Sequence, residues 1–106
     1  MSFDIYIDCG ADFVLTLTLR DEDGNLVDLT GATVSAQMRE NPEANDHFDF
    51  TVTHNDDGGK ILMRMPPETT EKIPFTEGVY DLFLTLSGEV MKVIDGKANI
   101  KPSATH

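Results

Sequence analysis

Hydrophobic and polar residues alternate along most of this chain, and the alternation is clearest between residues 13 and 19. The odd-numbered residues from Phe13 to Leu19 are apolar, and Thr16 and Thr18 lie between them. Successive side chains of a strand point to opposite faces, so a period of two indicates a strand with one face on a core. This segment is therefore predicted to be a half-buried β-strand.

The same alternation recurs in short segments that are separated by turn-forming residues such as Asp23-Gly24, Gly58-Gly59 and Asp95-Gly96. Glycine and aspartate favour the backbone conformations that tight turns require. Helical character is confined to residues 68–73, which fit at most one or two turns. The remaining predicted strands are 26–29, 33–39, 47–53, 60–65, 79–86, 90–94 and 97–101.

Seven or eight short strands with regularly spaced turns predict an all-β fold. The favoured architecture is an antiparallel two-sheet β-sandwich with Ig-like connections and at most one short helix near residues 68–73. The length of 106 residues suits a single domain spanning residues 1–106. No repeat, linker or low-complexity segment divides it.

The acidic charge of the chain argues against several classes of binding partner. The chain carries 19 acidic residues against 8 Lys and Arg, a formal net charge of -11. Nucleic-acid binding depends largely on cationic side chains that neutralise phosphates, so no nucleic-acid partner is expected for this acidic chain. An anionic membrane surface repels a negatively charged protein, so no membrane partner is expected either. No apolar run approaches the roughly 20 residues of a membrane span, and the start resembles no signal peptide. One cysteine, Cys9, fits a reducing compartment.

Candidate catalytic and metal-binding groups are sparse. Asp21, Asp23 and Asn25 alternate like the first ligands of a calcium loop, but the later glycine and glutamate of an EF-hand are missing. A hairpin turn explains them better, although a weak surface calcium site of another kind stays open, as it does for residues 55–57. His47 and His54 are an odd number of residues apart, so one strand would place them on opposite faces. We expect no enzyme, cofactor or metal site.

Three surfaces are candidates for protein contacts. Phe83 falls on the strand face opposite Leu82 and Leu84 in sequence parity, and an apolar outer face is typical of a partner surface. An N-terminal edge strand could pair with another subunit, and the loop 41–46 is polar and contains proline. The candidate interface residues are Phe3, Ile5, Ile7, Asn41, Pro42, Asn45 and Phe83.

Three stretches of the chain resemble a known family, and they occur in the same order as in that family. The first is residues 7–13, where a strand begins after Gly-Ala, and the second is residues 21–33, an acidic hairpin followed by Asp-Leu-Thr-Gly. The third is residues 78–102, which contain Gly-Val-Tyr-Asp-Leu and a terminal hairpin. The sequence is similar there to small proteins from the structural gene clusters of tailed bacteriophages, whose tail and baseplate components contain Ig-like sandwich domains. Residues 41–73 match little, and the chain ends Thr105-His106 where the family has Thr-Arg.

The resemblance implies a non-enzymatic virion protein of the neck, tail or baseplate, assembled in the host cytoplasm. Its expected partners are other virion structural proteins and further copies of itself in a symmetric homo-oligomer. The charge of -11 leads us to expect a comparatively basic neighbour. The alternative is a glycan-binding module, with or without calcium. A third hypothesis, an acidic mimic of nucleic acid, requires acids on one face, whereas here they cluster in turns.

Overall fold

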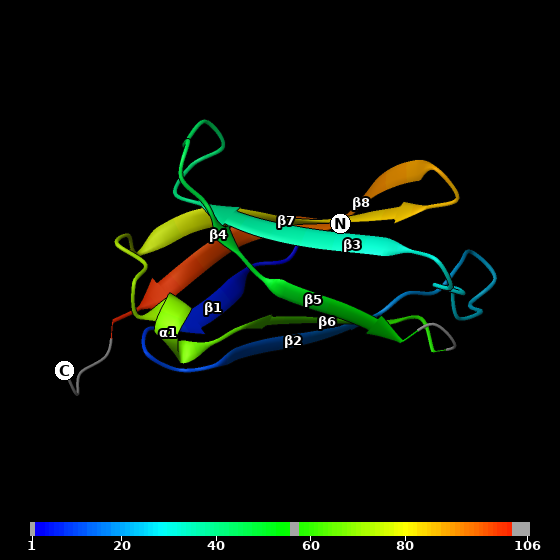
Figure 1. The fold of residues 1–106 in the computed structure, drawn as a ribbon, viewed down its shortest axis with the longest axis horizontal. Helices are drawn as coiled ribbons and strands as arrows, with labels where there is room; N and C mark the ends of the chain where they lie inside the picture. The colour runs from blue at the N-terminus through cyan, green and yellow to red at the C-terminus, as the bar shows by residue number, and fades with distance from the viewer. Residues whose placement is uncertain (1, 56–57, 103–106) are drawn as a thin grey trace.

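A computed structural model describes residues 2–55 and 58–102 and shows eight strands and one short helix in this part of the chain (Figure 1). The helix, α1 (Pro67–Thr70), lies between the sixth and seventh strands. The strands are β1 (Ile5–Asp8), β2 (Phe13–Thr18), β3 (Thr33–Arg39), β4 (Phe48–Asp49), β5 (Thr51–Asn55), β6 (Lys60–Met65), β7 (Glu77–Leu86) and β8 (Glu89–Lys101).

The strands form two sheets that face each other across the core (Figure 1). The larger sheet has the order β1-β8-β7-β3-β4, and the smaller has the order β2-β6-β5. Helix α1, between β6 and β7 in the chain, lies at one end of the two sheets (Figure 1). The predicted all-β fold in two sheets is confirmed.

The core consists of the apolar members of the alternating segments. Every second residue of β6 is buried, and so is every second residue of β7 from Gly78 to Leu84. Three aromatic rings bridge the sheets: Phe50 lies 5.7 Å from Phe13 and 6.4 Å from Tyr80, measured between ring centroids. Tilted and edge-on aromatic pairs of this kind stabilise a core beyond their buried area. These aromatic side chains therefore fill the interior.

One strand pairing differs from the predicted antiparallel arrangement. β1 lies parallel to β8, with Ile5 opposite Ala98 and Ile7 opposite Ile100, so the five-stranded sheet is mixed. Ile5 and Ile7 are 2% and 0% exposed. Burial of these two side chains removes apolar surface from water and stabilises the pairing, although alternation alone could not reveal the strand's direction.

The predicted strand over residues 26–29 is wrong. Leu26 forms only an isolated bridge with Arg20, and Leu29 is buried without joining a sheet. The Asp28 carboxylate accepts hydrogen bonds from the amide (3.0 Å) and hydroxyl (2.6 Å) of Thr30, which lower the pKa of Asp28. Aspartate that bonds the backbone two residues ahead initiates a turn, so this segment turns toward β3 instead of continuing a hairpin.

The boundaries of two further elements differ from those predicted from the sequence. Residues 47–53 do not form one strand, because the chain leaves the larger sheet after β4 and enters the smaller sheet at β5. The amide of Phe50, between them, donates to the carbonyl of Ala36 at 3.1 Å. The helix spans residues 67–70, within one residue of the predicted start but shorter than 68–73.

Residues 90–94 and 97–101 belong to a single strand, β8, because Asp95-Gly96 does not turn. Gly96 lies opposite Tyr80 in the sheet, and a Cβ at this glycine would collide with the backbone of Phe3. The glycine is required for this close approach of two chain segments rather than for a turn.

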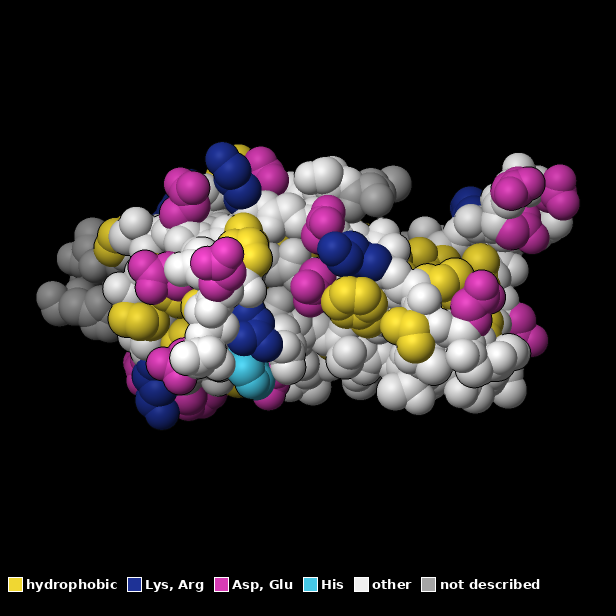
Figure 2. Space-filling model, turned by 90° about the horizontal axis from the view of Figure 1, so that it is seen from above, with side chains coloured by type: hydrophobic (Ala, Val, Ile, Leu, Met, Phe, Trp, Pro, Cys, Tyr) yellow, Lys and Arg dark blue, Asp and Glu magenta, His cyan; other side chains and the backbone are white. Residues whose placement is uncertain are grey.

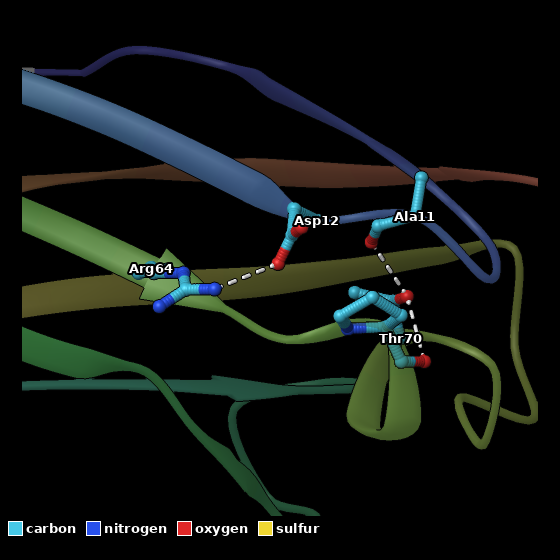
Figure 3. A network of polar contacts seen from close by, with 5 residues as sticks. Ala11, Asp12, Arg64 and Thr70 are labelled. Atoms are coloured by element: carbon cyan, nitrogen blue, oxygen red, sulfur yellow. Dashed lines mark hydrogen bonds and ion pairs between the residues drawn. The ribbon is translucent and has the colours of Figure 1, made fainter.

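A buried threonine joins helix α1 to the connection between β1 and β2 (Figure 3). Thr70 is 0% exposed. Its hydroxyl accepts from the amide of Gly10 at 3.1 Å and donates to the carbonyl of Ala11 at 2.9 Å. A buried polar group needs such partners, since leaving one unsatisfied costs free energy.

The substitution Thr70→Val is expected to lower the free energy of unfolding by about 1–3 kcal/mol, because it keeps the side-chain volume and leaves two backbone groups of residues 10 and 11 without their partner. Urea unfolding measures the change. Thr70→Ser retains the hydroxyl and should lose only about 1 kcal/mol for the missing methyl. Equal stability of the valine variant and the native chain would contradict this role.

Candidate functional site on the outer face of the five-stranded sheet

The outer face of the larger sheet carries a groove of about 470 Å³. Figure 2 looks onto this face, where basic, acidic and apolar side chains lie side by side. The groove is lined by the segment before β1, by β3, β7 and β8, and by the loop after β3. Its lining side chains include Ser2, Asp4, Gln37, Arg39, Pro42, Val79, Asp81, Lys92, Asp95 and Lys97.

Three surfaces that the sequence predicted separately meet at this groove. Pro42 lines it directly, and Ser2 and Asp4 line it on either side of Phe3 in the chain. Phe83 lies beside it, opposite the groove residue Lys92 in the sheet. The N-terminal segment, the loop 41–46 and the outer face of β7 therefore border one depression.

Charges on this face are ordered in rows across the strands. The strand register places Asp95 opposite Asp81, Asp81 opposite Gln37, and Gln37 opposite Asp49. Two rows flank this acidic row: one contains Lys97, Val79 and Arg39, and the other contains Lys92, Phe83 and Ser35. The face thus presents an acidic row between two rows that carry cations.

The acidic row costs stability. Asp81 and Asp95 are directly opposite, and like charges in that position repel each other. The ammonium of Lys92 lies 3.4 Å from the Asp95 carboxylate and partly offsets the repulsion. Local conflict with the fold's own stability is typical of surfaces that serve binding.

Phe83 and Lys92 form the apolar and cationic side of the groove. Phe83 is half-buried on the outer face, as its position in the alternation predicted. The Lys92 ammonium lies 5.8 Å from the centre of the Phe83 ring, within the range of a cation–π interaction. This contact orients the lysine over β7.

The loop side of the groove is held by Arg39. Its guanidinium donates to the carbonyl of Ala44 at 2.6 Å and to the side-chain oxygen of Gln37 at 3.1 Å. The side chain of Asn41 accepts from the amide of Glu43 at 3.0 Å, which tightens the turn. The exposed loop thus has a defined conformation beside the sheet.

The N-terminal wall is fixed by three hydrogen bonds. The amide of Phe3 donates to the carbonyl of Asp95 at 2.7 Å, and the Asp4 carboxylate accepts from the amide of Lys97 at 3.1 Å. The phenol of Tyr80 donates to the carbonyl of Phe3. Burial, followed by the charges of Asp4 and Asp95, raises the pKa of Tyr80 to about 12.

Two predicted interface side chains do not reach this surface. Ile5 and Ile7 point into the core, so their side chains cannot contact a partner while the fold is intact. The expectation that residues 3–7 form an edge strand agrees with the position of β1 at the end of its sheet. Tyr6 is 63% exposed and Phe3 is 47% exposed, so these two side chains are accessible there.

Asn45 lies at a different hollow, of about 510 Å³, next to His47 and Phe75. The imidazole of His47 is 3.0 Å from the carboxylate of Asp49. The predicted loop is thus shared between two depressions, with Pro42 in one and Asn45 in the other.

Sequence reasoning missed the charged residues of the groove, above all Arg39, Asp81, Asp95 and Lys97. Their signal was available, since Arg39 and Asp81 occupy outward positions of strands 33–39 and 79–86. The register between those strands, which places the charges in rows, is a property of the fold and not of any one segment.

The candidate catalytic and metal-binding side chains occupy turns and partly buried positions of the fold. The Asp21 carboxylate accepts from the amides of Asp23 (2.9 Å) and Asn25 (3.0 Å), as in a tight polar turn. His54 lies 3.0 Å from the carbonyl of Ala32, and Cys9 is half-buried. Asp56 and Asp57 lie outside the described residues.

Within residues 2–55 and 58–102, no three His, Cys, Asp or Glu side chains are grouped so as to hold a metal ion. In the same part of the chain, no helix has the length and apolar character to cross a membrane.

No protein-family model matches this chain, and no curated protein is significantly similar to it in sequence.

The raised pKa of Tyr80 makes stability depend on alkaline pH. An unfolded tyrosine ionises near pH 10, below the value of about 12 in the folded chain. The unfolded state then binds fewer protons than the folded state, so stability is full below pH 10 and falls as pH rises toward 12. Denaturant unfolding across this range measures the slope.

Tyr80→Phe should remove the contribution of Tyr80 to that slope, and it should loosen the Phe3 segment in hydrogen exchange because the phenol no longer binds its carbonyl. Tyr6→Phe is the matched control, since its ring is 63% exposed. An unchanged slope in Tyr80→Phe would show that this phenol is not the group responsible.

Proposed function

We propose that this chain is a non-enzymatic structural protein of a tailed-phage virion, a neck, tail or baseplate component that docks in several copies on other virion proteins. The observation that carries the proposal is the convergence of three separate chain segments on one ordered groove. The resemblance of residues 7–13, 21–33 and 78–102 to phage structural proteins supplies the biological setting.

The chemistry of the groove supports protein docking. A binding surface combines apolar contacts with polar groups whose charge pattern selects the partner. Here Val79 and Phe83 provide apolar area, and the alternating charged rows provide a pattern that only a complementary surface can match. A partner that supplies cations above Asp81 and Asp95 would relieve their repulsion and so gain affinity.

The charge of the chain favours a basic neighbour. The chain as a whole has a charge of -11, and Asp4, Asp81 and Asp95 line the groove itself. Attraction between opposite charges accelerates the encounter and disfavours acidic partners. The docking partner in this proposal is therefore a comparatively basic virion protein.

We also propose Ig-like connectivity for the sandwich. If β2 to β8 correspond to strands B, C, C′, D, E, F and G, the order β8-β7-β3-β4 corresponds to G-F-C-C′ and β2-β6-β5 corresponds to B-E-D. This agreement favours the Ig-like arrangement. β1 differs, because it lies beside the last strand instead of beside β2.

The virion role is tested by purifying phage particles from the source of this sequence and locating the chain in them. We expect mass spectrometry to find it in a fixed ratio to other structural proteins, and an antibody to label the neck, tail or baseplate. A chain that is expressed but absent from purified particles would refute the role. Glycan-array binding that is abolished by a chelator would establish the alternative, a calcium-assisted glycan-binding module.

The groove is tested by the double substitution Asp81→Lys and Asp95→Lys, which replaces the two directly opposed acids of the acidic row with cations and so repels a basic partner. Incorporation into particles should fall by about tenfold or more, as loss of a few close charge pairs allows. Glu68→Lys with Glu71→Lys is the matched control: both side chains are exposed at helix α1, away from the groove lining, and this variant should be incorporated normally. Equal incorporation of both variants would exclude the groove as the docking surface.

A further inference from the structure

The strand β2 has an open edge that lacks the usual protection against pairing. It lies at the end of the smaller sheet, with β6 as the one strand that pairs with it among the described residues. Its sequence from Phe13 to Thr18 contains no charge, no proline and no glycine, and its register with β6 is unbroken. Edge strands normally carry lysine, proline or a bulge that prevents another strand from joining.

The backbone groups that face this open edge belong to the even-numbered residues. The amide of Leu19 donates to the carbonyl of Gly59 at 2.7 Å, just before β6 begins, so the backbone amide and carbonyl of residue 19 face the β6 side of the strand. Backbone groups alternate in direction along a strand. The amides and carbonyls of Val14, Thr16 and Thr18 therefore point away from β6, toward the open edge.

The outward positions of the three strands of the smaller sheet carry no acid. Register places nine side chains in the outward positions of β2, β6 and β5, and they include two cations and four threonines but no acid. Two copies of a chain with a charge of -11 repel each other over most of their surface. These positions are Val14, Thr16, Thr18, Thr51, Thr53, Asn55, Lys60, Leu62 and Arg64.

The other sheet edges are less suited to pairing. β4 has two residues and β1 has four. β5 is linked to the larger sheet, because the His54 imidazole lies 3.0 Å from the carbonyl of Ala32 and the Phe50 amide binds the carbonyl of Ala36. β2 is the longest edge strand in the described part of the chain, at six residues.

We propose that two copies of this chain join through β2, edge to edge and antiparallel, so that the two smaller sheets form one continuous sheet. A strand added to an open edge gains main-chain hydrogen bonds along its length. This partner is distinct from the one at the groove, which lies on the other sheet, so the inference does not rest on the virion role.

Charge complementarity selects the register. With Thr16 of each copy at the two-fold axis, Val14 lies opposite Thr18 of the second copy, and Asp12 lies opposite Arg20. Both members of that charged pair are exposed, and Asp12 already lies 3.1 Å from Arg64 at the same corner (Figure 3). The opposite charges favour this register over one shifted by two residues, which would separate them.

Sedimentation velocity of the purified full chain tests the proposal. The native chain should dimerise, and Thr16→Lys should weaken dimerisation by at least about tenfold because it places two ammonium groups together at the axis. Thr53→Lys is the matched control: Thr53 lies in the same row across the sheet, at the opposite edge, and its variant should dimerise normally. Thermal unfolding confirms that each variant folds.

A charge exchange tests the register. Asp12→Arg alone should weaken the dimer, and adding Arg20→Asp should restore it, since the opposite charges then face each other again. A native chain that stays monomeric, a dimer that Thr16→Lys leaves unchanged, or a double variant that fails to recover would overturn the proposal. None of these results bears on the groove, whose test is incorporation into particles.

Discussion

The pairing of the first strand with the last is the interaction on which the rest of this structure depends. β1 takes its place beside β8 because Ile5 and Ile7 enter the core and the Phe3 segment crosses Gly96 closely. This pairing builds one wall of the groove, which Ser2 and Asp4 line. The Phe3 amide donates to the carbonyl of Asp95, and the Asp4 carboxylate accepts from the amide of Lys97, so this segment is held beside β8. The pairing also leaves β2 without a second neighbour, so one constraint produces both the groove and the open edge.

The two outer faces of the sandwich have different electrostatic characters. The larger sheet presents charged rows of both signs beside Phe83, whereas the smaller sheet presents threonines with Lys60 and Arg64. A chain with this net charge can bind two different partners when each face has its own pattern. In our two proposals, the groove binds a basic protein and the smaller sheet binds a second copy of the chain.

The sequence predicted which segments are strands and which side chains enter the core, because alternation reports burial directly. The prediction was accurate for β2, β3, β6 and β7, and for the outward position of Phe83. It was wrong where a local signal served another purpose: Asp28 turns the chain before β3, and Gly96 permits a close crossing inside β8. Direction and register depend on contacts between distant residues, so neither the parallel β1 nor the charged rows could be read from one segment.

The contact between the two ends of the chain has a consequence for the order of folding. The amide of Lys97 binds the carboxylate of Asp4, a partner 93 positions away. During synthesis, the segment around Ile5 and Ile7 leaves the ribosome long before β8 exists, and it stays without its strand partner until β8 has emerged. Contacts of such long range slow folding and expose apolar segments to aggregation. Completion of the larger sheet therefore waits for β8, and a nascent chain shortened before β8 would leave Ile5 and Ile7 without the strand that covers them.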